Sequence, residues 1–233
     1  MSDATKTELS LRDEIAISRD SVRDHAEFDL WPVQHSTFSE YLERFKDVVD
    51  GVKLVDHLKT VPSPTIIDFM SSTDALVGLF PQLPQQDRLG IAVGLKDHRT
   101  PGEKARDEGL GVHQVIGDIT SSATWRKLIE GLKGRKADVI VESAWGGISV
   151  LPASGGFYAV MAQRAWDLLS QDHGILIAEL ENPITLSDYG INLKTQIKRL
   201  NESGIPSVVD LSGGNSAVRL ERTPQSPSKL PVF

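Results

Sequence analysis

The sequence predicts an α/β fold of three layers, in which helices cover both faces of a mostly parallel sheet of about seven strands. Short apolar segments alternate with amphipathic helical segments from residue 65 to residue 180. These segments are apolar throughout rather than at every second position, which is typical of parallel strands buried on both faces. The last two strands are separated only by a short glycine-containing turn, so we expect them to form an antiparallel hairpin.

We divide the chain into three regions. Residues 1–64 are expected to form an N-terminal helical extension, and residues 65–222 the α/β domain. Residues 223–233 form a C-terminal tail, which we expect to be loose because it is rich in proline and serine.

Within the extension, apolar residues recur at steps of three and four over residues 37–58, which predicts one amphipathic helix. Thr37 and Glu40 are placed for a capping box at its start. Pro62 and Pro64 follow, and proline cannot continue a helix because it lacks the backbone N–H.

The α/β domain is expected to begin with a strand over residues 65–69 and a helix over residues 73–80. Thr100 and Glu103 are placed to cap the second helix, and Ser121 or Ser122 to cap the third, whose buried face would include Trp125 and Ile129. The remaining predicted strands cover residues 89–95, 113–116, 137–141, 175–180, 207–211 and 217–222. Helices are expected in the region that follows residue 142 and over residues 186–202.

Composition and charge exclude several classes of function. The net charge is −7, which disfavours nonspecific binding to nucleic acid because such binding needs clustered Lys and Arg. The chain has no cysteine, and its six histidines lack the spacing of metal ligands, so we expect no metal site. No apolar run approaches the ~20 residues of a membrane helix, and the polar start does not resemble a secretory signal. A cytoplasmic location is therefore expected.

Five strand–helix units followed by a helix and a terminal hairpin resemble the class I S-adenosylmethionine-dependent methyltransferases over residues 65–222. The resemblance implies a Rossmann-like fold, S-adenosylmethionine as cofactor and a cofactor turn after the first strand. On that pattern Asp68 takes the family's acidic place, while Met70, Ser72 and Asp74 replace its three glycines.

A turn without glycine can hold a ligand in another way or no longer hold one. Ser71, Ser72 and Thr73 carry hydroxyl groups that could replace the backbone contacts that glycine allows. The alternative is that residues 71–74 simply cap the helix that follows.

Two further landmarks of the family are partial. The acid that holds the cofactor ribose usually ends the second strand, whereas here the first acid is Asp97, and the alternative is that Asp97 is a surface loop residue. Asp118 resembles the family's adenine-binding acid, with Ile119 beside the ring, although Asp118 could also be a loop or cap residue.

The family places catalytic or substrate-facing groups after the fourth strand, where this chain has Glu142 and Trp145. Glu142 could act as a general base, and Trp145 could stack on a flat substrate or on the sulfonium cation. The sequence motifs of amino-methylating and ribose-methylating members are absent, which argues against nucleic acid as the substrate.

The sequence therefore leaves two functions open. One is methyl transfer from S-adenosylmethionine to a small-molecule or protein acceptor, and the other is a catalytically inactive, methyltransferase-like binding or scaffolding protein. A nicotinamide-dependent oxidoreductase would need a Gly-x-Gly-x-x-Gly turn, which residues 70–80 do not supply. The oligomeric state does not follow from the sequence.

Overall fold

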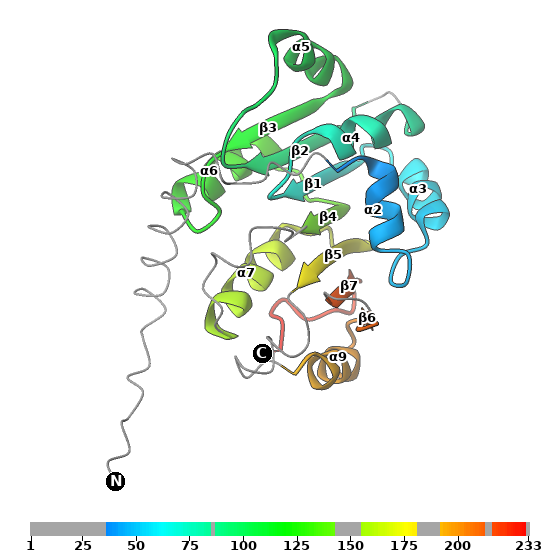
Figure 1. Cartoon of the computed structure of the whole chain (residues 1–233). Coiled ribbons are helices and arrows are strands. Elements are labelled where there is room, and N and C mark those ends of the chain that lie inside the picture. Colours follow the sequence, from blue (N-terminus) through cyan, green and yellow to red (C-terminus); the bar gives the residue numbers. More distant parts are fainter. Residues whose placement is uncertain (1–35, 85–86, 143–154, 181–191, 213–215, 232–233) are drawn as a thin grey trace, which may run out of the picture.

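A computed structural model describes residues 36–84, 87–142, 155–180, 192–212 and 216–231 of the 233 (Figure 1). The helices and strands are, in chain order, α2 (Phe38–Arg44), α3 (Gly51–Thr60), β1 (Thr65–Phe69), α4 (Asp74–Leu79), the 3₁₀ helix η1 (Phe80–Gln82), β2 (Leu89–Gly94), α5 (Pro101–Leu110), β3 (Val112–Ile116), α6 (Ser122–Leu132), β4 (Val139–Glu142), α7 (Gly155–Leu168), β5 (Gly174–Leu180), α9 (Leu193–Glu202), β6 (Ser207–Asp210) and β7 (Ser216–Arg222).

The strands form one seven-stranded sheet in the order β3-β2-β1-β4-β5-β7-β6. The first five strands are mutually parallel, and β7 lies antiparallel between β5 and β6. This arrangement confirms the predicted α/β, Rossmann-like fold with its C-terminal antiparallel hairpin. All five residues of the central strand β1 are buried, as expected for a parallel strand covered on both faces.

The two faces of the sheet are covered by different helices, which gives three layers (Figure 1). Because side chains alternate along a strand, Ile67 and Phe69 point to one face and Ile66 to the other. On the first face these residues pack with apolar side chains of α6 and α7. On the second face Ile66 packs with apolar side chains of α2, α3 and α4.

The single helix predicted over residues 37–58 is wrong: the structure has two helices, α2 and α3, joined by a corner. Asp50 caps α3, since its Oδ1 accepts hydrogen bonds from backbone N–H groups in the first turn, including that of Lys53 at 3.2 Å. Gly51 lacks a side chain where Leu42 of α2 packs against the backbone of α3. The apolar periodicity continues through the corner, which is why the pattern alone predicts one helix.

The capping residues predicted from the sequence are confirmed, although the length predicted for the first helix is not. The predicted capping box of Thr37 and Glu40 is present, and so is that of Thr100 and Glu103 at the start of α5. Ser121 caps α6 through the N–H of Ala123. The expectation that Ile129 is buried in α6 is wrong, because its side chain is 55% exposed.

The C-terminal tail is not loose as predicted, but packs against α7. Leu230 is buried, and its N–H donates to Oε1 of Gln163 at 2.9 Å. The indole Nε1 of the fully buried Trp166 donates to the carbonyl oxygen of Pro227 at 3.0 Å. A proline-rich composition suits an irregular segment, but here the segment covers apolar surface on a helix.

Candidate functional site

The carboxyl ends of β3, β2, β1 and β4 meet at one edge of the sheet, where an open α/β sheet binds ligands. The register places Phe69 at the end of β1 beside Val93 of β2 and Glu142 of β4. Gly94, the last residue of β2, pairs with Ile116 of β3. We call this the carboxyl edge. The site residues predicted from the sequence lie near the ends of these strands or in the turns that follow them.

The turn after β1 keeps a glycine-like backbone although it has no glycine. Met70, at the first of the family's glycine places, has φ +58°, in the left-handed region that favours glycine. The turn passes close to β2, where the N–H of Ser71 donates to the carbonyl of Val93 at 3.2 Å. A Cβ on Gly94 would lie 2.9 Å from the carbonyl oxygen of Ser71, so this approach requires glycine on β2 rather than in the turn.

Asp68 is buried, and a helix of the N-terminal extension covers it. The hydroxyl of Tyr41 on α2 lies 3.1 and 3.2 Å from the two carboxylate oxygens of Asp68, and 3.1 Å from Oγ of Ser71. Burial raises the pKa of Asp68 to about 7, against hydrogen bonds from Ser71 and Tyr41 that lower it. The sequence does not identify Tyr41 as part of this site, because its spacing is that of a core residue of the helix.

The hydroxyl groups proposed to contact a cofactor are used inside the protein. Ser71 donates to the carbonyl oxygen of Ser72 at 2.8 Å, and Ser72 donates to Oδ2 of Asp74 at 2.9 Å. Thr73 donates to Oδ2 of Asp107 on α5 at 2.7 Å, and both side chains are buried. Each of these hydroxyl donors is therefore already paired with another part of the chain.

Asp107 joins the turn to the region of Asp97. Besides Thr73, Asp107 accepts hydrogen bonds from Arg99 at 3.2 Å and from Arg106 at 2.8 Å. The same Arg99 donates to both carboxylate oxygens of Asp97, at 2.9 and 3.2 Å. The Nζ atom of Lys104 lies 3.0 Å from Oδ2 of Asp97.

The hydrogen bonds from Arg99 hold the pKa of Asp97 well below its usual range. A carboxylate held by two cations is a weak acceptor for a ribose hydroxyl. The interpretation of Asp97 as a loop residue tied to its neighbours therefore gains support.

Asp118 and Ile119 lie in the turn that follows β3, near the strand end where the sequence predicted them. The half-buried Asp118 accepts hydrogen bonds from the N–H of Thr120 at 2.8 Å and from its hydroxyl at 2.7 Å, which shapes the turn. The side chain of Ile119 is buried in the core, and its carbonyl oxygen accepts a hydrogen bond from Nε1 of Trp125 at 2.7 Å. The backbone of this turn is thus fixed, with a carboxylate at the carboxyl edge.

Glu142 ends β4 at the same edge, but on the other face of the sheet from Asp68. Alternation along β4 places Glu142 on the face of Ile140, which packs with α6 and α7, whereas Tyr41 holds Asp68 on the face of α2. Burial raises the pKa of Glu142 to about 7, close to the value that suits a general base at neutral pH. Trp145 lies outside the described residues.

A cavity of about 60 Å³ opens between the turn and the start of α5, lined by Ser72, Thr73 and Gln114 among others. The side-chain oxygen of Gln114 on β3 is buried here and accepts no hydrogen bond within the described part of the chain. Such an acceptor fits a hydroxyl donor of the ribose of S-adenosylmethionine, and Asp118 fits the adenine amino group. The methionine end of the cofactor is less well matched, because the hydroxyls of residues 71–73 are already paired.

Over the same described residues, the structure has no cluster of three or more metal-ligating side chains and no helix long and apolar enough to span a membrane.

Comparison with known proteins finds only distant similarity, in structure and not in sequence. No family model matches the chain, and no curated protein matches it in sequence. Among solved structures, it is similar to the CurJ carbon methyltransferase, with 13% identity, a TM-score of 0.49 and coverage of 76% of this chain and 54% of the other. The chain thus spans about half the length of that protein.

Two further methyltransferases are similar over more of their length. One, from Geobacter sulfurreducens, has 14% identity and a TM-score of 0.43, with coverage of 87% of this chain and 96% of the other. The other is an S-adenosylmethionine-dependent O-methyltransferase from Thermotoga maritima, with 11% identity, a TM-score of 0.45 and coverage of 81% and 72%.

Proposed function

We propose that the chain binds S-adenosylmethionine at the carboxyl edge and transfers its methyl group to a small-molecule or protein acceptor. The observation that carries the proposal is the sheet order, which places Asp118 after β3 and Glu142 at the end of β4 along the same edge of one parallel sheet, with β2 and β1 between them. The left-handed backbone of Met70 adds support, since it preserves the bend of a glycine turn.

The residues at the edge would have distinct roles. Asp118 and Gln114 would accept hydrogen bonds from the nucleoside, while Ile119 keeps the turn in place from the core. When bound, S-adenosylmethionine supplies an electrophilic methyl group. The carboxylate of Glu142 would take the proton that an acceptor hydroxyl or amine loses, and the rest of catalysis is the positioning of the acceptor.

The pKa of Glu142 leads to a specific pH dependence. Its carboxyl group is deprotonated, and able to accept a proton, only above about pH 7, so transfer should rise through that value and then level off. We expect Glu142→Gln to abolish this rise and lower the rate about 100-fold while leaving cofactor affinity nearly unchanged. Formation of S-adenosylhomocysteine with panels of small-molecule and protein acceptors is the measurement.

A second candidate, an inactive methyltransferase-like binding protein, is favoured by a different observation. The hydroxyls of Ser71, Ser72 and Thr73 bond to other groups of the chain, Tyr41 covers Asp68, and cations hold Asp97. A protein that no longer binds a cofactor could use such contacts simply to stabilise its turn. The exclusion of nucleic acid as a partner stays a prediction from the sequence.

Isothermal titration with S-adenosylmethionine and S-adenosylhomocysteine separates the two candidates. Methyl transfer requires micromolar binding, weakened about tenfold or more, or ~1.4 kcal/mol, by Asp118→Ala. Asp172→Ala, an equivalent change of an exposed acid in the turn before β5, should leave the affinity unchanged. Absence of binding at millimolar ligand would reject the enzyme and leave the binding protein.

A further inference from the structure

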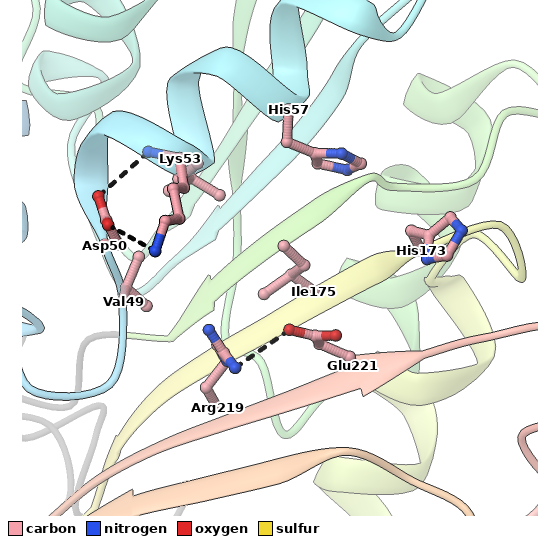
Figure 2. Close-up of a pocket in the computed structure, with 9 residues that line it drawn as sticks. Val49, Asp50, Lys53, His57, His173, Ile175, Arg219 and Glu221 are labelled. Atoms are coloured by element: carbon pink, nitrogen blue, oxygen red, sulfur yellow. Dashed lines mark hydrogen bonds and ion pairs between the residues drawn. The ribbon is translucent and has the colours of Figure 1, made fainter.

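A second cavity lies on the sheet face covered by α3, away from the carboxyl edge. Its volume is about 300 Å³, at the lower end of the ~300–1,000 Å³ range of small-molecule sites. Figure 2 shows its lining, with His57 reaching down from α3, His173 from the turn before β5, and Arg219 and Glu221 from β7. Since Glu221 pairs with Ile175 near the start of β5, the cavity lies toward the amino end of that strand.

The wall of this cavity combines apolar and charged side chains. Val49 and Leu54 from the α2–α3 region are buried, and Ile175 of β5 is partly buried. A ligand with an apolar body could therefore rest against the sheet, with its polar group toward the charged rim.

The charges of the rim are balanced within each element. Lys53 of α3 forms an ion pair at 3.2 Å with Asp50, the capping residue of this helix, and Arg219 and Glu221 of β7 form one at 3.1 Å, as the dashed lines in Figure 2 indicate. Both acids are thus occupied by a cation of their own helix or strand. A cationic ligand would have to displace an existing partner from either of them.

Two buried nitrogen atoms of the lining have no hydrogen-bond partner among the described residues. They are Nε2 of His57 and Nε of Arg219. The Nε of a guanidinium group can only donate, and an imidazole nitrogen that carries a proton donates as well. A buried donor without an acceptor costs about 1–3 kcal/mol, so Nε of Arg219 points to a missing acceptor, and Nε2 of His57 to a missing partner of either kind.

The imidazole of His173 adds a third group to the same space. The ring centres of His57 and His173 lie 6.5 Å apart, with the planes at 81°. The two rings come from separate segments, and both line the cavity that Arg219 lines further along the sheet (Figure 2). With Lys53, four nitrogen-bearing side chains therefore line one cavity, and nothing in the proposed methyl transfer uses them.

The geometry points to a binding site for a small organic anion, in which a carboxylate or phosphate group accepts a hydrogen bond from Arg219 and an apolar body packs on Ile175. Arginine suits this role because it is always charged and binds oxyanions through parallel N–H groups. The site is separate from the carboxyl edge and does not depend on binding of S-adenosylmethionine there.

The experiment titrates the full-length protein with benzoate, phenyl phosphate and the neutral benzamide, followed by amide chemical shifts in NMR spectra. We expect saturable shifts on α3 and β7 with at least one of the two anions, and none with benzamide. Comparison of benzoate with phenyl phosphate identifies which oxyanion the site prefers. No saturable shift with either anion at millimolar concentration, or equal shifts with benzamide, would overturn the proposal and leave a water-filled cavity.

Variants test the assignment of the donor. Arg219→Gln should weaken anion binding about tenfold, whereas Arg126→Gln, the same change at an exposed position of α6, should leave it unchanged. Glu221→Gln frees the guanidinium of Arg219 from its partner and should strengthen binding several-fold. A gain of affinity cannot result from partial unfolding, so unchanged or weaker binding by Glu221→Gln would count against the site.

Discussion

The buried carboxyl group of Asp68 should make the stability of the protein depend on pH in an unusual direction. Its pKa is raised from 3.8 to about 7 by burial beneath Tyr41. Between these values the folded protein holds a proton at Asp68 that the unfolded chain has lost. Stability therefore falls as pH rises through this window and becomes constant above it.

The substitution Asp68→Asn removes this dependence. Asparagine has the same shape, its Oδ1 can accept the hydrogen bond from Tyr41, and it has no charge to bury. From the two pKa values, wild-type Asp68 loses about 3 kcal/mol of folding free energy between about pH 5 and about pH 8. The variant should therefore gain about 3 kcal/mol relative to wild type over the same interval.

Urea denaturation followed by tryptophan fluorescence, at both pH values, measures this difference. Asp138 and Glu142, whose pKa values are also raised by burial, contribute equally to both proteins and cancel. The matched control is Asp97→Asn: the pKa of Asp97 is lowered, so this acid is ionised in both states above about pH 5 and its effect should not change with pH. An equal effect of Asp68→Asn at the two pH values would refute the assignment of Asp68 as a buried, proton-holding group.

Two further predictions concern the turn after β1 and the C-terminal tail. Because Met70 has a positive φ, Met70→Gly should be more stable than Met70→Ala by about 1 kcal/mol in urea denaturation, and a more stable alanine variant would contradict the left-handed turn. Leu230→Ala should cost about 2 kcal/mol and change the fluorescence of Trp166, whereas Val208→Ala on the exposed side of β6 should cost less than about 0.5 kcal/mol. Equal costs of these two substitutions would mean that the tail is loose after all.

The sequence alone determined the α/β class, the order of strands and helices along the chain from residue 65, and the antiparallel end of the sheet. These features depend on local patterns: uninterrupted apolar segments for buried parallel strands, capping boxes at Thr37 and Thr100, and a turn too short for a parallel crossover. Such patterns are written in neighbouring residues, so they can be recognised without the fold. They also led to Asp118 and Glu142 at the ends of their strands.

Only the tertiary structure decided what the site residues contact. Tyr41 lies 27 positions from Asp68, and Asp107 lies 34 positions from Thr73, yet these partners satisfy the groups that the sequence had reserved for a ligand. The corner at Asp50 and the packed tail likewise depend on surfaces brought together by folding. Hydrogen bonds and burial between distant segments leave no periodic signal, and they determine whether a polar side chain is free to bind.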